Sequence, residues 1–446
     1  MSAWLESSKV YLDRRVIAVL FLGFSSGLPF LLVFSTLSFW LKAEGVSLAA
    51  IGLFSLVRTP YTFKFLWAPL VDHVPVPVLS RVLGRRRGWT IVTQVALMGA
   101  VFGLGSTNPG AAPFETALLA LLVAFCSATQ DIMIDAYRIE ILEENEQGAG
   151  AGVLVAGYRI GLLTAGFGAL QLSTMFAWSQ VYMIMAALVT VGIVTVLVSP
   201  EPQVAEEAGA ADTGGRRVFR DIDAGASGSA THALRWLQEA IVAPFKEFMT
   251  RGGWAIILLF IMLYKLGDAY LGVMANPFYV EMGFSAQEIA NVSKIFGLGA
   301  TVVGGIIGGL FVRQIGILRS LLICGVLQML SNLVFAVQAA VGHNVGMLVA
   351  TIGVENITGG MATAAFVAYL SSLCNVAYTA TQYALLSSFM AFARDVLSAS
   401  SGVLAEQVGW IGFFVATTIV AVPGLLVLLW LMRRYPPRPA PAPAAD

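Results

Sequence analysis

The side chains best suited to chemistry lie in the stretch QDIMIDAYR, residues 130–138, which continues an apolar run without a break. Asp131 and Asp135 are four residues apart, so a helix would place both carboxylates on one face, and Arg138 continues that face. The apolar run predicts a membrane-spanning helix, in which an ionisable side chain is costly unless it faces the protein interior or a water-filled path. The pattern therefore predicts a functional site.

Other acidic residues lie at predicted membrane depth in the second half of the chain. Burial disfavours the charged form of a carboxylate and a nearby cation favours it, so a change of conformation can load and release a proton. Glu355 has no basic residue near it in sequence, which favours protonation, whereas Asp268 follows Lys265 by three residues and could form a static pair with it. The residues that we predict to exchange protons are Asp131, Asp135, Asp268 and Glu355.

Basic residues outnumber acidic residues at predicted membrane depth. The bases are Arg58, Lys64, Arg138, Arg159, Lys265, Lys294 and Arg394, and the acids are Asp131, Asp135, Asp268, Glu355 and Asp395. If most acids pair with a base, a small surplus of cations remains, which predicts an anionic or zwitterionic ligand. Alternatively, the charges form ion pairs that only fix helix packing. Small residues suffice for packing, so a water-accessible cavity explains the number of charges better.

Only helices that cross a bilayer can hold these charged residues at membrane depth. The chain has 446 residues, of which 58% are hydrophobic and 12% charged, and its mean hydropathy is +0.81. Soluble domains carry about a quarter charged residues, so a soluble protein is nearly excluded. We predict an all-α membrane protein with twelve spans, at residues 16–41, 47–71, 88–106, 114–140, 149–172, 175–198, 253–280, 286–312, 317–340, 344–372, 376–402 and 408–432.

The distribution of Lys and Arg among the short loops predicts that both termini are cytoplasmic. The predicted domains are a six-helix bundle over 1–198, a cytoplasmic linker with an amphipathic helix over 199–252, a second six-helix bundle over 253–433 and a Pro/Ala-rich disordered tail over 434–446. This plan is typical of major facilitator transporters, whose two halves rock about a site at mid-membrane.

The loop after the second predicted span carries Asp72 and the basic run Arg85, Arg86 and Arg87. In this superfamily the corresponding loop holds an acid and bases that latch the halves in one state, so we predict the same role here. The alternative is that these basic residues only set the orientation of the chain in the membrane.

The composition argues against several other classes of function. The chain has 26 basic and 26 acidic residues, and this balance argues against a nucleic-acid partner. The three His lie at loops or helix ends, and the three Cys lie inside apolar runs, so we predict neither a metal site nor a disulfide. No Ser or Cys has a His nearby in the predicted elements, so we predict no catalytic residues and no enzyme.

The segments resemble those of the AmpG family of muropeptide permeases, a branch of the major facilitator superfamily. The matching runs cover almost the whole chain in the expected order, and QDIMIDAY and KLGDA are the most specific. They are LGFSSGLPF (22–30), FKFLWAPLVD (63–72), GRRRGW (84–89), FCSATQDIMIDAY (125–137), GYRIG (157–161), LYKLGDAY (263–270), ENITGGMATAAFVAYLSSLCN (355–375) and ATQYALLSS (380–388).

The resemblance implies import across the bacterial inner membrane, driven by the proton-motive force without a cofactor. The implied cargo is N-acetylglucosaminyl-1,6-anhydro-N-acetylmuramic acid, with or without its stem peptide, for peptidoglycan recycling and, in some bacteria, for β-lactamase induction. We expect a monomer whose partners are this anionic sugar-peptide and membrane lipid. Some family members carry two further C-terminal helices, and we expect transport not to depend on them.

The resemblance and the polar pattern together predict the substrate-binding residues. Tyr264, Lys265 and Asp268 share a helical face, and Asp131 or Asp135 could form a buried pair with Arg159 of the next span. The predicted substrate-binding set is Gln130, Asp131, Tyr158, Arg159, Tyr264, Lys265, Asn356 and Gln382. Two alternatives remain for the function: a carrier of another organic anion such as acetyl-coenzyme A, and a non-transporting membrane sensor.

Overall fold

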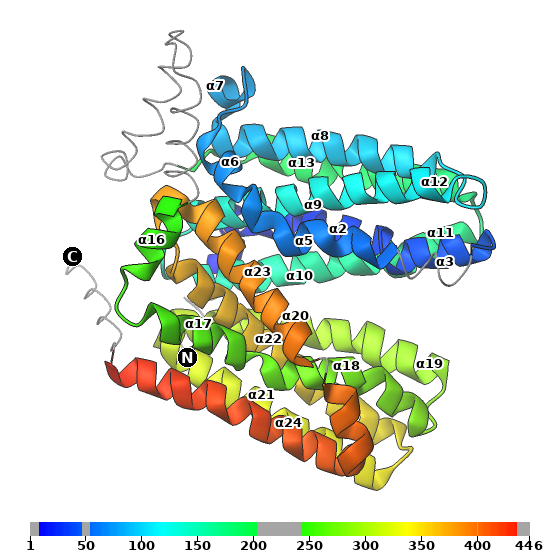
Figure 1. The fold of residues 1–446 in the computed structure, drawn as a ribbon, viewed down its shortest axis with the longest axis vertical. Helices are drawn as coiled ribbons and strands as arrows, with labels where there is room; N and C mark the ends of the chain where they lie inside the picture. The colour runs from blue at the N-terminus through cyan, green and yellow to red at the C-terminus, as the bar shows by residue number, and fades with distance from the viewer. Residues whose placement is uncertain (1–8, 47–53, 203–241, 399, 435–446) are drawn as a thin grey trace. The chain divides into compact units, whose positions relative to one another are not determined.

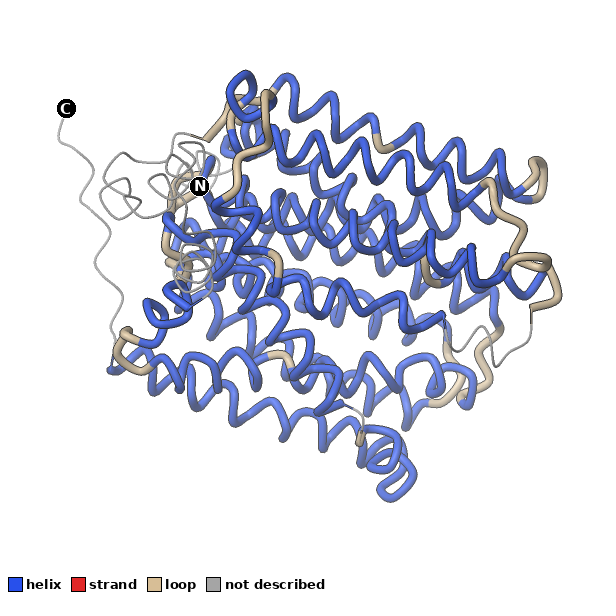
Figure 2. The backbone as a smooth tube through the Cα atoms, turned by 45° about the horizontal axis from the view of Figure 1, so that its top comes forward, coloured by secondary structure: helices blue, strands red, loops and turns tan. Residues whose placement is uncertain are grey.

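The computed structural model describes residues 9–46, 54–202, 242–398 and 400–434, and these residues form helices joined by short loops (Figures 1 and 2). No strand occurs among them. The prediction of an all-α protein is therefore confirmed for the described part of the chain.

Ten helical segments of the described chain are long and apolar enough to cross a membrane. They match ten of the predicted spans, with boundaries that differ by a few residues. They run over Arg14–Ala43, Arg85–Gly105, Pro113–Ile141, Gln147–Ser173, Trp178–Val198, Trp254–Glu281, Gln287–Ile315, Ile317–Val341, Val345–Ser372 and Ser401–Arg434. The total of twelve, and the cytoplasmic location of the termini, stay predictions.

The other two predicted spans are also helical where they are described. The span at 47–71 begins in residues outside the description and continues as short pieces, η2 (Phe54–Arg58), α5 (Thr59–Phe63), η3 (Lys64–Leu66) and α6 (Ala68–His73). Pro60 and Pro69 each lie near the start of a piece, where a missing N–H costs least. The span at 376–402 corresponds to α23 (Thr379–Ser398), which is a helix but is not among the ten apolar segments.

Much of the predicted linker and nearly all of the predicted tail, residues 203–241 and 435–446, lie outside the described residues. Within the part of the linker that is described, α16 (Ala243–Met249) is a short helix whose Pro244 and Phe248 are buried. The chain divides into two compact units: unit 1 comprises residues 1–250 and 370–391, and unit 2 comprises residues 251–369 and 392–446.

In unit 1 the longest helices pack through small residues. Besides α16, the short pieces of the second span and the start of α23, its helices are η1 (Lys9–Leu12), α2 (Arg14–Leu32), α3 (Ser35–Ala43), α7 (Leu79–Leu83), α8 (Arg85–Gly105), α9 (Pro113–Ile141), α10 (Gln147–Leu163), η4 (Thr164–Gly168), α11 (Ala169–Ser173), α12 (Trp178–Leu188), α13 (Thr190–Val198) and η8 (Val376–Tyr378). A Cβ at Gly157 or Gly161 of α10 would collide with a backbone carbonyl of α2, and one at Gly23 or Gly27 of α2 would collide with α10. Gly157 and Gly161 form a GxxxG pair at a close helix contact, which holds α2 in register with α10.

The helices of unit 2 also pack through small residues. Besides the end of α23, they are α17 (Trp254–Tyr264), α18 (Leu266–Glu281), α19 (Ala286–Ile289), η7 (Ala290–Phe296), α20 (Gly297–Ile315), α21 (Ile317–Val341), α22 (Val345–Ser372) and α24 (Ser401–Arg434). Gly304 and Gly308 of α20 leave no room for a Cβ against the backbone of α22.

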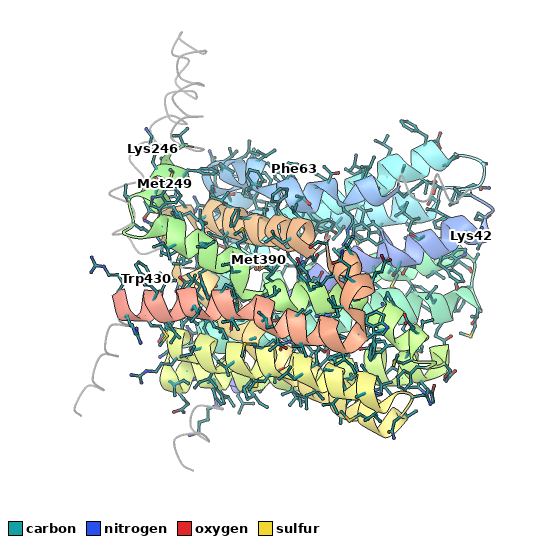
Figure 3. The ribbon with its side chains drawn as sticks, turned by 60° about the horizontal axis from the view of Figure 1, so that its bottom comes forward. Lys42, Phe63, Lys246, Met249, Met390 and Trp430 are labelled. Atoms are coloured by element: carbon teal, nitrogen blue, oxygen red, sulfur yellow. The ribbon has the colours of Figure 1, made fainter. Side chains whose placement is uncertain are left out.

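Large apolar side chains such as Phe63 on α5 and Trp430 on α24 are exposed (Figure 3), as suits helices in lipid.

Candidate functional site

The carboxylate of Asp131 lies where α9 meets α2. The Ser26 hydroxyl donates a hydrogen bond to Asp131 Oδ1 at 2.6 Å. The adjacent Gln130 is fully buried; its amide donates to the Ser25 carbonyl at 2.9 Å, and its Oε1 accepts from the Ser25 hydroxyl at 3.3 Å. Two consecutive polar residues of α9 are thus held by two consecutive serines of α2, which fixes the direction in which the Asp131 carboxylate points.

Asp135, one turn further along α9, faces a cation from a different element. Lys64 Nζ of η3 lies 4.0 Å from Asp135 Oδ2, and both side chains are mostly buried. This distance is at the limit of an ion pair and long for a hydrogen bond. The two carboxylates predicted on one face therefore have different surroundings: Asp131 is bound by a hydroxyl, and Asp135 by a loosely paired ammonium group.

Arg138 does not pair with either carboxylate, although it follows Asp135 by three residues. Its side chain is fully buried, and its guanidinium donates to Gln147 Oε1 at 3.2 Å and to the Ser371 hydroxyl at 2.9 Å. The same group lies 5.5 Å from the ring centre of Tyr383. The pair predicted between α9 and α10 is not formed either, because Asp131 binds Ser26 and Arg159 is exposed.

In unit 2 the structure confirms one predicted pair and shows a second polar contact that was not predicted. Lys265 Nζ lies 2.8 Å from Asp268 Oδ2, as the three-residue spacing predicts. The Asn356 amide donates to Glu355 at 2.7 Å and to the Ile352 carbonyl at 3.0 Å, while its oxygen accepts from the Thr301 hydroxyl at 2.8 Å.

In two residues of the predicted binding set, Tyr264 and Gln382, the polar atoms form hydrogen bonds with other residues of the protein. The Tyr264 hydroxyl donates to the Leu321 carbonyl at 2.9 Å. Gln382 is buried; its Oε1 accepts from the Asn375 backbone N–H at 2.7 Å, and its amide donates to the Pro244 carbonyl at 3.2 Å and to Glu247. Tyr158 remains beside other aromatic rings, with its ring centre 6.4 Å from that of Phe30.

Asp72 is the centre of a buried charge cluster in unit 1. Arg86 Nη2 donates to Asp72 Oδ1 at 2.9 Å, and Arg86 Nε donates to Glu140 Oε2 at 2.9 Å. Asp72 Oδ2 accepts from the Thr381 backbone N–H at 2.7 Å and from the Thr381 hydroxyl at 2.6 Å, and Oδ1 also accepts from the Ala380 N–H at 3.3 Å. Asp72 therefore caps the N-terminus of α23, where a negative charge is favoured.

Two of the three predicted arginine partners, Arg86 and Arg87, have different environments. Arg86 is 1% exposed and binds Asp72 directly. Arg87 donates to the carbonyls of Val196 and Leu197 at 2.9 Å each, so it caps the end of α13. Glu201 accepts from the backbone N–H groups of Arg86 and Arg87 at 2.8 and 3.1 Å, which satisfies donors that the start of α8 leaves free.

The charge of Asp72 follows from these contacts. Asp72 lies just beyond the predicted span 47–71. Burial alone would raise the pKa of its carboxyl, but the guanidinium groups of Arg86 and Arg85 and the hydrogen bonds from Thr381 hold that pKa below its ordinary value. Asp72 is therefore ionised at neutral pH. The stability that it contributes is present above the ordinary carboxyl pKa and is lost as the pH falls through the lowered one.

Ser26, Glu140 and Thr381 are among the partners that the sequence did not predict. Glu140 carried a signal, because an acid at the end of a predicted span has to find a cation or water. Ser26 and Thr381 carried none, because a hydroxyl residue in an apolar helix most often bonds to its own backbone.

Comparison with known proteins supports the pattern found in the sequence. The chain matches the family described as Major Facilitator Superfamily over residues 16–393 and 262–446. It is 39% identical over 423 residues to the Anhydromuropeptide permease of Escherichia coli (strain K12), covering 94% of this chain and 80% of that relative. It is 34% identical over 429 residues to Putative transporter AmpG 4 of Rickettsia felis, covering 96% and 99%.

Solved structures share the fold at low sequence identity. The proton:xylose symporter XylE superposes with a TM-score of 0.64 at 13% identity, covering 98% of this chain and 96% of the symporter. The human organic anion transporter MFSD10 superposes with a TM-score of 0.66 at 16% identity, covering 93% and 99%. These structures confirm the predicted major facilitator fold.

Proposed function

Because the chain belongs to the AmpG family of the major facilitator superfamily, we propose that it imports anhydro-muropeptides from the periplasm to the cytoplasm by alternating access. The chain is a multi-pass protein of the inner membrane. The observation that carries the proposal is the 39% identity to a protein named Anhydromuropeptide permease, which extends over 94% of this chain. The solute is an anionic sugar-peptide, which the chain moves as a monomer in lipid without altering it chemically.

Import is driven by protons, and the acids of α9 are the proposed proton carriers. Asp131 is bound by an uncharged hydroxyl and Asp135 lies 4.0 Å from Lys64, so neither carboxylate is held by a tight ion pair. A small rearrangement can therefore change whether each carboxylate is charged. Asp268 is a less suitable carrier, because Lys265 holds it at 2.8 Å.

The buried cluster of Asp72, Arg86 and Glu140 is the proposed latch. Asp72 connects the start of α23 to α8 through Arg86, and Arg86 connects α8 to the end of α9 through Glu140. Buried charges have two stable arrangements, paired with each other or hydrated, and few between. Breaking the cluster in one step would release α23 when the transporter changes state.

Uptake of labelled anhydro-disaccharide tests this function. Cells that lack their own permease and express this chain are expected to accumulate the disaccharide, with and without its stem peptide, and an uncoupler of the proton gradient is expected to stop accumulation. An excess of acetyl-coenzyme A should not compete. If well-expressed protein gives no accumulation above vector, the cargo is wrong; if accumulation continues with the uncoupler present, proton coupling is wrong.

A further inference from the structure

Arg58, at the end of η2, lies on an aromatic surface. Its guanidinium carbon is 5.0 Å from the ring centre of Phe34 and 6.0 Å from that of Phe30. Contacts at this distance hold a guanidinium by cation–π attraction. A guanidinium that contacts aromatic rings still has N–H groups that can donate hydrogen bonds to a ligand.

Among the described residues, Arg58 has no carboxylate as a counter-ion. Its side chain is exposed, although residue 58 lies near the middle of the predicted span 47–71. In the part of the chain that the structure describes, no carboxylate lies within ion-pair distance of Arg58, whereas Lys64 faces Asp135. An exposed cation at bilayer depth has to face water rather than lipid. Arg159 is also exposed, but no ring contact fixes its position.

The aromatic surface under Arg58 continues to the α9 site. The ring centre of Phe30 is 4.7 Å from that of Phe34, 5.4 Å from that of Tyr61 and 6.4 Å from that of Tyr158. Phe30 follows Ser26 by one helical turn, and Ser26 binds Asp131. Arg58 and Asp131 are thus connected by one wall of side chains within unit 1.

Two buried hydroxyl groups lie near this wall. Within the described residues, Tyr61 Oη and Ser127 Oγ have no well-formed hydrogen bond, and their polar contact is with each other. Ser127 precedes Asp131 by one turn of α9, so both side chains point to the same face. A pair of hydroxyls that interact only with each other keeps donor and acceptor capacity for water or a polar group of a ligand.

We propose that Arg58, held by Phe30 and Phe34, binds the carboxylate of the transported solute. Arginine binds a carboxylate through two parallel N–H donors, and the contacts with Phe30 and Phe34 hold the guanidinium in place before the solute arrives. In the anhydro-disaccharide without peptide, the lactyl group of the muramic acid carries the carboxylate. This assignment rests on the proposed function, and it adds the residue that recognises the negative charge.

A pair of matched solutes tests the assignment: the labelled anhydro-disaccharide and its derivative with the lactyl carboxylate converted to an uncharged amide. The wild-type chain is expected to prefer the acid. Arg58→Gln should raise KM for the acid about 10- to 100-fold, since bonds to a charged group are among the strongest, and should leave KM for the amide unchanged. Arg58→Lys, which keeps the charge but not the planar fork, should give an intermediate KM.

The matched control is Lys42→Gln, which removes an exposed cation at the end of α3 (Figure 3) and should leave the preference for the acid intact. Phe34→Leu should weaken the preference less than Arg58→Gln does. Equal losses for acid and amide in Arg58→Gln, or no loss, would overturn the assignment. If that variant does not reach the membrane, Arg58→Lys decides by the same comparison.

The two proposals fail in different ways. If the wild-type chain takes up both solutes equally, the role of Arg58 is wrong and the proposed function stands. If it takes up neither, the proposed function fails, and equilibrium binding of the acid and the amide to the purified protein decides about Arg58 separately. Equal binding of the acid by wild type and Arg58→Gln would then count against the carboxylate site.

Discussion

Asp131→Asn is expected to reduce the initial rate of anhydro-disaccharide uptake by roughly 100-fold or more, because a group that exchanges a proton typically contributes about that factor. An amide has nearly the shape of the carboxylate and can still accept the hydrogen bond that Ser26 donates at 2.6 Å. It cannot gain or lose a proton near neutral pH. The variant should therefore fold and reach the membrane but fail to couple uptake to the proton gradient.

The measurement is the initial rate of uptake, normalised to the amount of protein in the membrane. Asp135→Asn should also lose uptake, because Lys64 would then lack its counter-charge. Glu115→Gln is the matched control, since Glu115 is an exposed acid in the first turn of the same helix. Full uptake by both Asp131→Asn and Asp135→Asn would contradict the role that we assign to α9.

Arg86→Met is expected to lower the free energy of unfolding by about 3–5 kcal/mol, the usual effect of leaving a buried charge without its partner. Arg86 is 1% exposed and binds both Asp72 and Glu140. Methionine fills a similar volume but cannot compensate either carboxylate. Thermal unfolding of the purified protein in one detergent, followed by its helical signal, gives the comparison with wild type.

A variant without any charge in the cluster shows whether Arg86→Met destabilises the protein by leaving charges unpaired or by disturbing the packing. The triple variant Asp72→Asn, Arg86→Met, Glu140→Gln should recover much of the stability, because no charge is left buried alone. Arg81→Met removes an exposed arginine of α7 and should change stability by less than about 0.5 kcal/mol. Arg86→Met and Arg81→Met with equal unfolding temperatures would show that the cluster has little effect on stability.

Local spacing predicted those parts of the site that lie within one helix or at one helix contact. The pair of Lys265 and Asp268 follows from their three-residue separation, and the close approach of α10 to α2 follows from Gly157 and Gly161. In both cases the geometry of the helix sets the distance, so the sequence contains the information.

Contacts made across the chain could not be predicted in the same way. Arg138 binds Ser371, which is 233 residues away in the sequence. A long arginine side chain can reach several neighbours, so the sequence does not show which of them it binds. The basic run after Asp72 contains three arginines. The direction of α8 decides that Arg86 is the one that binds Asp72, and the sequence does not show this direction. The helix at 47–71 was predicted as one span, but it is divided into short pieces around Pro60 and Pro69.

The most direct test is proton movement in vesicles that contain only the purified protein. With no gradient imposed, adding anhydro-disaccharide outside weakly buffered vesicles is expected to make the outside more alkaline as protons enter with the solute. The double variant Asp131→Asn, Asp135→Asn should give no such change. Entry of labelled disaccharide without any change of external pH in the wild-type protein would contradict the account.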